Sequence, residues 1–217
     1  MKLSETTVNV LKNFSTINPS ILFKPGNTIS TVSPTKTMMA TVSVDETFEV
    51  QAGIYELPKF IGVLSLFDKP DLSFSSTKVD IKSGHRSLSY TCASPEMLIA
   101  PSKDIVMPPS VFEFTLPEAE LIKLNRASSV LQLPDVVIET DDDNIIMAAT
   151  NLKNPTSDSY KVEVSVNSVA DYVKRAVIKA EYLSKLMPRD YVVTITDKNI
   201  CKFETDKLTY YIALESV

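Results

Sequence analysis

A short amphipathic segment that follows an apolar strand constrains the fold of this chain more than any other feature, and it occurs twice. In the first copy, residues 48–55 have the pattern of a strand, residues 57–67 follow as a helix, and residues 68–71 stop it. At 100° per residue, the large apolar side chains of the helix fall on one side, with Lys59 and Gly62 on the other. A helix of about three turns is marginal alone, so we expect it to pack on a sheet.

Residues 175–190 repeat this order, with an apolar strand end, a Glu near the helix start, an outward Lys and a stop made by Pro and Asp. A repeated unit in 217 residues predicts two similar domains of about 100 residues each. We expect domains at 1–93 and 111–217, joined by an interdomain connector at 94–110. The fold class is α+β, with antiparallel sheets and two helices in each domain.

Two further stretches have helical periodicity. Residues 3–17 form one helix with Ser4 as its N-cap, and another starts at Pro117 and runs to about Leu131, with Leu131 facing inward and Ile122 outward. The other apolar segments alternate like hairpin strands. These are residues 21–23, 28–32, 37–44, 72–74, 78–82, 87–92, 111–114, 136–139, 145–149, 160–166, 191–196, 199–204 and 208–214.

The connector is rich in proline and sustains neither helical nor strand periodicity, which is typical of an extended linker. It nevertheless carries apolar residues that a solvated tether does not need. Those residues either pack along the seam between the domains or line a pocket for a partner's peptide, and the sequence leaves both readings open. They are Met97, Leu98, Ile99, Ile105, Val106 and Met107.

Catalytic and metal-binding patterns are missing from the sequence. His85 is the single histidine and lies in a predicted hairpin turn, and Asp141–Asp143 lack the spacing of a calcium loop, so a solvated acidic hairpin tip is the better interpretation. The sequence has no Gly-rich nucleotide loop and no zinc pattern. Cys92 and Cys201 read as buried thiols in a reducing compartment. We therefore expect a protein without catalysis, metal or cofactor, and, since no long apolar run occurs, one that is soluble and has no membrane partner.

Cations recur on the predicted helices, opposite the apolar side. The candidate set is Lys12, Lys59, Lys123, Arg126, Lys179 and Lys185. The net charge of −5 argues against nonspecific nucleic-acid binding when taken alone, but most acidic residues fall in predicted turns. If the helices share one face, that face is positive and the rest of the molecule negative. Ordinary solvated lysines explain any single member of the set equally well.

Several ordered stretches make the chain resemble DNA polymerase sliding clamps, and closely those of T4-like bacteriophages. The resemblance extends over essentially the whole chain and is strongest at the N-terminus and at 54–66. The residues that carry it are 1–4 (MKLS), 11–14 (LKNF), 16–18 (TIN), 54–57 (IYEL), Phe60, Gly62, 64–66 (LSL), 131–133 (LQL) and 211–215 (YIALE).

The resemblance implies a closed ring of three two-domain subunits, with duplex DNA passing through a hole lined by helices. The cations named above would then face phosphates without reading sequence. It also implies edge-to-edge contacts between strands of neighbouring subunits, and a role in the cytoplasm of the infected bacterial host.

Partners implied by the resemblance are the DNA polymerase, the clamp loader and a phage late-transcription apparatus, which would dock through short apolar C-terminal peptides. We place their pocket beneath the connector, at Leu98, Ile105, Val106 and Leu214.

Two alternatives remain at this stage. One is a β-rich structural or assembly protein of a virion, which would also be acidic and free of cofactors but would not need cations on all four helices. The other is a metal-dependent hydrolase that uses Asp141–Asp143.

Overall fold

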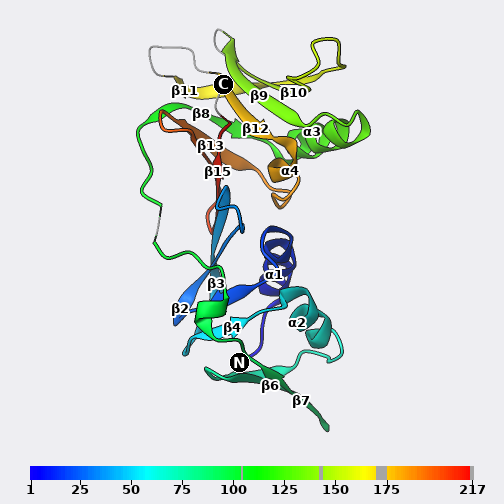
Figure 1. The fold of residues 1–217 in the computed structure, drawn as a ribbon, viewed down its shortest axis with the longest axis vertical. Helices are drawn as coiled ribbons and strands as arrows, with labels where there is room; N and C mark the ends of the chain where they lie inside the picture. The colour runs from blue at the N-terminus through cyan, green and yellow to red at the C-terminus, as the bar shows by residue number, and fades with distance from the viewer. Residues whose placement is uncertain (104, 142–143, 170–174, 216–217) are drawn as a thin grey trace. The chain divides into compact units, whose positions relative to one another are not determined.

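The computed structural model describes residues 1–103, 105–141, 144–169 and 175–215. It divides into two compact units, which we call unit 1 (Met1–Asp104) and unit 2 (Ile105–Val217). Each unit combines antiparallel strands with two α-helices that contact each other (Figure 1). The predicted α+β class with antiparallel sheets is therefore confirmed.

Unit 1 contains three small antiparallel groups of strands, in which β1 pairs with β4, β2 with β3, and β6 lies between β5 and β7. Its elements are α1 (Glu5–Ile17), β1 (Ile21–Phe23), β2 (Gly26–Val32), β3 (Met38–Phe48), β4 (Ala52–Ile54), α2 (Leu57–Leu64), β5 (Asp71–Phe74), β6 (Lys78–Ser83), β7 (Arg86–Thr91) and the 3-10 turn η1 (Pro95–Met97).

Helix α1 begins where the sequence predicts, because the Ser4 hydroxyl accepts a hydrogen bond from the Thr7 N–H at 3.1 Å. Its apolar side buries Leu11 and Phe14 completely. Helix α2 is fixed at its start by the Leu57 N–H, which donates to the Pro19 carbonyl at 2.7 Å. Both helices therefore present one buried side to unit 1 and leave the opposite side exposed.

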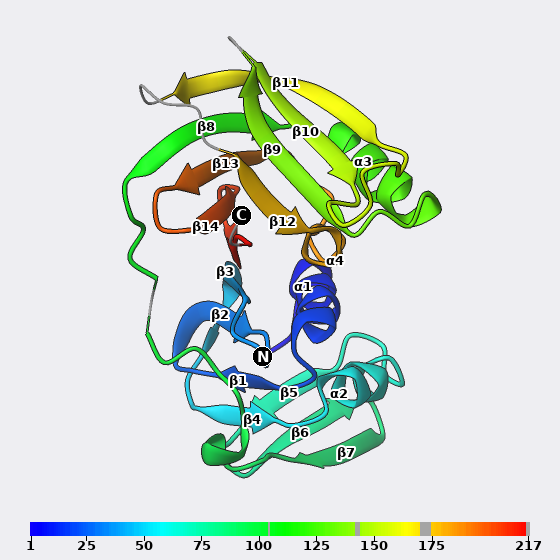
Figure 2. The ribbon, with the colours of Figure 1, turned by 45° about the horizontal axis from the view of Figure 1, so that its top comes forward.

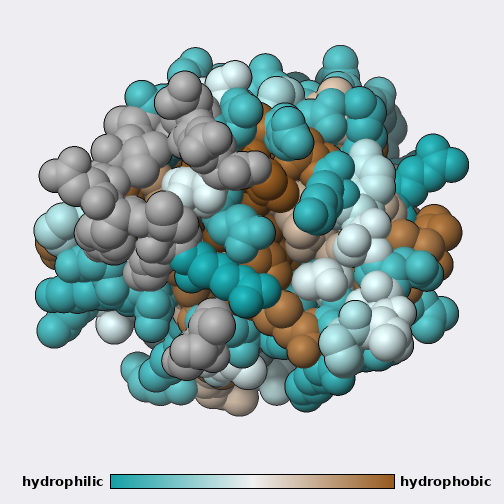
Figure 3. All heavy atoms as spheres, turned by 90° about the horizontal axis from the view of Figure 1, so that it is seen from above, coloured by the Kyte–Doolittle hydropathy of each residue, from teal (hydrophilic) through white to brown (hydrophobic). Residues whose placement is uncertain are grey.

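Unit 2 is built on one antiparallel arrangement, whose described strands run in the order β12-β9-β10-β11-β8-β13-β14-β15 (Figure 2). Helix α3 packs against β10 and β11 and contacts α4. The elements are β8 (Ser110–Leu116), α3 (Glu118–Val130), β9 (Asp135–Asp141), β10 (Asn144–Thr150), β11 (Tyr160–Val169), β12 (Ala176–Lys179), α4 (Ala180–Leu183), β13 (Tyr191–Thr196), β14 (Ile200–Glu204) and β15 (Leu208–Ala213). The face at the top of Figure 1 mixes hydrophilic side chains with apolar ones (Figure 3).

Four local predictions are wrong, and the first is Cys92, which was expected to be buried and is only half-buried. The strand expected over residues 48–55 is interrupted, because β3 ends at Phe48 and the chain runs through an exposed bend before β4. The helix expected over residues 57–67 is shorter, because α2 ends at Leu64. Turns follow it, in which the Phe67 N–H donates to the Leu64 carbonyl. Leu131 is 40% exposed, since α3 ends at Val130 and Gln132 turns the chain with a φ of 53°.

The sequence also led to expectations about the histidine, the acidic hairpin tip, metal sites and membrane helices. His85 is exposed in the turn between β6 and β7, as predicted. Asp142 and Asp143 lie outside the described residues, so the acidic hairpin tip stays a prediction. In the described part of the chain, no cluster of three or more His, Cys, Asp or Glu residues could hold a metal ion. Nor does that part contain a helix with the length and apolarity needed to cross a membrane.

Candidate functional site

Lys12 lies on the exposed side of α1, and its ammonium has no ion-pair partner among the residues that the structure describes. It borders a groove of about 410 Å³ between α1 and α2, whose lining is mainly apolar and includes Ile61 and Leu64. Lys69 borders the same groove and has a φ of 42°. Sequence reasoning missed Lys69 because residues 68–71 were interpreted only as a helix stop.

Lys59 is exposed on α2 and forms an ion pair with Glu56, with 3.0 Å between Nζ and Oε2. The hydrogen bond with the Glu56 carboxylate, aided by its charge, raises the pKa of Lys59. Solvent-exposed pairs of this kind contribute little to stability and exchange partners readily. Lys59 is thus available to a phosphate only in competition with Glu56.

Helix α3 carries two exposed cations with different surroundings. Lys123 Nζ lies 2.8 Å from Glu120 Oε1, one turn earlier, and this hydrogen bond raises the pKa of Lys123. Arg126 is exposed, and no carboxylate of the described chain lies within ion-pair distance of it. Arg126 in unit 2 is therefore the counterpart of Lys12 in unit 1.

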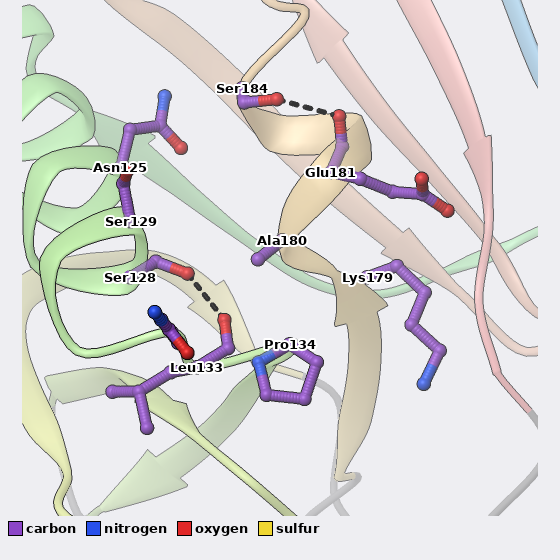
Figure 4. A pocket seen from close by; sticks show the side chains of 10 residues that line it. Asn125, Ser128, Ser129, Leu133, Pro134, Lys179, Ala180, Glu181 and Ser184 are labelled. Atoms are coloured by element: carbon purple, nitrogen blue, oxygen red, sulfur yellow. Dashed lines mark hydrogen bonds between the residues drawn. The ribbon is translucent and has the colours of Figure 1, made fainter.

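The groove between α3 and α4 is lined by more polar residues than the one between α1 and α2. Figure 4 shows Asn125 and Ser128 on α3 and Ser184 after α4, around a cavity of about 490 Å³. Asn125 Nδ2 donates to the Leu183 carbonyl at 3.1 Å, and the Ser128 hydroxyl donates to the Leu133 carbonyl at 2.6 Å. The Asn125 bond joins α3 to the end of α4, whereas the Ser128 bond fixes the turn that follows α3.

Lys179 occupies the end of β12, before α4, and extends away from α3 (Figure 4). Its Nζ lies 2.6 Å from Asp135 Oδ1, and the Asp135 side chain is only 3% exposed. The hydrogen bond with Asp135 raises the pKa of Lys179. The second Asp135 oxygen accepts the Leu152 N–H at 3.1 Å. Lys179 thus has a structural partner inside unit 2, and a DNA contact from it stays a prediction.

Lys185 lies beyond the end of α4, which is only four residues long. It is half-buried, and its Nζ lies 5.9 Å from the centroid of the Tyr182 ring. Such a cation–π contact leaves part of the ammonium available to solvent.

The predicted peptide pocket divides between the two units. Leu98 belongs to unit 1 and is half-buried, whereas Ile105, Val106 and Leu214 belong to unit 2. Val106 is 89% exposed and Leu214 is 8% exposed. The grouping of the four residues into one pocket stays a prediction.

Within unit 1, the connector lies along a groove of about 290 Å³ whose other wall includes Leu22, Thr28 and Ser30. Sequence reasoning missed these residues. The alternation of β2 could have found them, because Ile29 and Thr31 are buried while Thr28 and Ser30 point to the opposite face.

Comparisons with known proteins cover nearly the whole chain. The family model described as "DNA polymerase processivity factor" matches residues 2–107, and the one described as "gp45 sliding clamp, C terminal" matches residues 113–216. The sliding clamp of Enterobacteria phage T4 is 29% identical over 226 residues, which cover 100% of this chain and 97% of that protein.

Two solved structures share the fold at low sequence identity. The proliferating cellular nuclear antigen of Entamoeba histolytica superposes with a TM-score of 0.72 at 13% identity, covering 97% of this chain and 95% of that one. The beta clamp of Helicobacter pylori, bound to a DNA ligase peptide, gives a TM-score of 0.73 at 12% identity and covers 100% and 65%. The predicted clamp fold is confirmed by these superpositions. With its first half matched by the processivity-factor model and its second half by the sliding-clamp model, this chain belongs to the sliding clamps, the processivity factors of DNA polymerases.

Proposed function

We propose that this chain encircles duplex DNA as a closed ring and tethers the replicative DNA polymerase for processive synthesis. The observation that carries the proposal is the placement of cations on the exposed sides of the long helix of each unit. Lys12 on α1 and Arg126 on α3 are exposed and have no ion-pair partner in the described chain. The rest of the chain is acidic enough to bring the net charge to −5.

Contacts of this kind suit sliding. Lysine and arginine attract phosphates regardless of base sequence, so they hold the duplex without stopping at any site. A closed ring then keeps the clamp on DNA by topology, and tight adhesion is unnecessary. The clamp itself performs no catalysis and needs no cofactor, and it acts in the cytoplasm of the infected bacterial host.

The ring that we propose is a homotrimer. Three copies would place twelve α-helices of the described kind around the duplex. Strand β7 in unit 1 and strand β12 in unit 2 support this, because each has a single partner strand in the described sheets, β6 and β9 respectively. Pairing β7 of one subunit with β12 of the next would cover both edges, which otherwise invite uncontrolled association.

Light scattering tests the ring directly. We expect a mass of three times 24.0 kDa at micromolar concentration. A stable monomer under the same conditions would contradict the homotrimer.

Retention on DNA tests the cations. Replacing Lys12 and Arg126 together by alanine should weaken loading or retention while leaving the trimer intact, because both side chains are exposed. The matched control replaces Lys36 and Lys153, which are also exposed but lie outside the helices, and removes the same charge. Equal losses from both double variants would point to net charge alone and would remove the assignment of the helices to DNA.

We also propose that the polymerase, the clamp loader and late-transcription factors dock through apolar peptides beneath the connector, at Leu98, Ile105, Val106 and Leu214. The ligase peptide bound to the Helicobacter beta clamp supports this. Because Val106 is 89% exposed, Val106→Asp should reduce binding of the polymerase C-terminal peptide without affecting folding. Val130→Asp, at a 73% exposed position on α3, is the control and should bind normally.

A further inference from the structure

The first half of the connector is fastened to unit 1. Ala93, the last residue before the connector, donates its N–H to the Gly53 carbonyl at 2.8 Å and forms an antiparallel bridge with the short strand β4. The 3-10 turn η1 follows, and its end places Leu98 back over the same glycine. A segment with these contacts is not a loose tether.

Gly53 is required by this close approach. A Cβ atom at position 53 would lie 2.6 Å from the Ala93 carbonyl oxygen and 2.7 Å from Leu98 Cδ1. Real Cβ contacts are longer than this, and the carbonyl oxygen belongs to the backbone, so the connector would have to move away. The backbone angles of Gly53 are not of the kind that only glycine adopts, since its φ is not positive. The constraint therefore comes from Ala93 and Leu98.

Asn18 makes the second attachment, from the end of α1. Its side chain is buried and donates from Nδ2 to the carbonyls of Val32, at 2.8 Å, and Ile99, at 2.9 Å. Its Oδ1 accepts the N–H and the hydroxyl of Ser20. The amide thus uses both donor hydrogens and both acceptor positions, and one of these bonds reaches across 81 residues to the connector.

The last attachment is weaker. Lys24 Nζ donates to the Pro101 carbonyl at 3.1 Å, in an exposed setting. We propose that Gly53 and Asn18 are positioning residues for partner binding, which hold residues 93–99 against unit 1 as a preformed wall of the peptide site. This inference rests on the peptide site proposed above.

A preformed wall raises the affinity for the peptide, because no binding free energy is spent on ordering residues 93–99. If a variant leaves the wall in place only a tenth of the time, the apparent affinity falls about tenfold. Gly53→Ala acts on the connector through its new methyl group. Asn18→Asp keeps the shape of the side chain but loses both donors and turns a carboxylate toward two carbonyl oxygens.

The experiment combines hydrogen exchange of the full-length clamp with titration of the fluorescent polymerase C-terminal peptide. In Gly53→Ala and Asn18→Asp, we expect exchange at residues 93–99 to speed up about tenfold and peptide affinity to fall about tenfold. Gly62→Ala is the matched glycine control, since a Cβ there meets nothing within 4 Å. Ile81→Ala, in the buried part of β6, lowers the stability of unit 1 away from the connector and should leave both readouts unchanged in the native state.

The outcomes separate this inference from the function on which it rests. Faster exchange with unchanged affinity, or unchanged exchange in both variants, would overturn the positioning role while the peptide site stands. A comparable loss of affinity in Ile81→Ala would reduce the effect to general stability and overturn it as well. A wild-type clamp that fails to bind the peptide would overturn the peptide site first.

Discussion

Each unit has a pair of helices in contact, but the contacts that hold the two pairs differ. In unit 1, α2 has eight residues and packs through Phe60 and Leu64, which leaves an apolar groove beside α1. In unit 2, α4 has four residues and buries Leu183, the Asn125 side chain donates to the Leu183 carbonyl, and Lys179, just before α4, pairs with Asp135. A short helix buries little apolar surface, so polar contacts with fixed geometry add to its packing.

The difference bears on function. In unit 1 the cations of the helix pair are all exposed, whereas in unit 2 Lys179 is committed to a buried carboxylate. Under the proposed function, the two units would therefore offer different sets of cations to DNA.

The largest expected effect is the loss of apolar packing in unit 1. Phe60 is completely buried and lies edge-on to the Tyr90 ring, at 5.1 Å between centroids. We expect Phe60→Ala to lower the free energy of unfolding by about 3–5 kcal/mol, measured by urea denaturation. A loss below about 1 kcal/mol would mean that α2 is held by something other than its apolar side.

The second effect concerns the ion pair in unit 2. Lys179→Met leaves the nearly buried carboxylate of Asp135 without its cation, and we expect a loss of about 3 kcal/mol. Lys12→Met is the corresponding change in unit 1 and should alter stability by less than about 0.5 kcal/mol, since Lys12 is exposed. Similar losses of stability in the two variants would mean that Lys179 is no more structural than Lys12.

A third, smaller effect is the response of the units to pH. Burial raises the pKa of both Tyr191 and Tyr210 in unit 2, where the Tyr191 hydroxyl donates to the Met187 carbonyl at 2.6 Å. The folded state keeps these protons when the unfolded chain begins to lose them near pH 10, so stability falls as the pH rises above that value. Urea denaturation at pH 8 and pH 10.5 measures the loss, which Tyr191→Phe should reduce.

Unit 1 has the opposite sensitivity at its first helix. Burial alone would raise the pKa of Glu46, but the Ser4 N–H and the Thr7 hydroxyl donate to its carboxylate and leave the pKa below the ordinary 4.5. The contribution of Glu46 to the stability of unit 1 is present above pH 4.5 and is lost as the pH falls through the lowered pKa. Relative to the intrinsic exchange rate, which itself falls in acid, the protection of the amides at the start of α1 should therefore decrease as the pH falls, and Glu46→Gln should already lose protection at pH 7.

The smallest expected effect is a gain in the stability of unit 1. Gly62 lies inside α2, is exposed, and would present a Cβ to open space. Gly62→Ala should stabilise unit 1 by about 0.5–1 kcal/mol, because alanine loses less backbone entropy in a helix. A loss of stability would indicate that the exposed side of α2 is in contact with something in the assembled protein.

The sequence predicts those parts of the fold that depend on neighbours along the chain. Periodicity and the Ser4 cap locate α1, and alternation locates strands such as β13. Contacts between residues that lie far apart in the sequence cannot be predicted from periodicity and alternation. Lys179 has the pattern of an outward helical lysine, yet its position is set by Asp135, 44 residues away. Nothing local marks Gly53 as the residue on which Leu98 rests, because glycine in a strand has several explanations.

Retention of the loaded clamp on closed circular DNA, compared with the same DNA after linearisation, tests the central claim most directly. A ring held by topology should persist on the circle when salt is raised and should leave within seconds to minutes once a free end is cut. Equal retention on both forms, lost in parallel as salt increases, would mean that the protein adheres to DNA and does not encircle it.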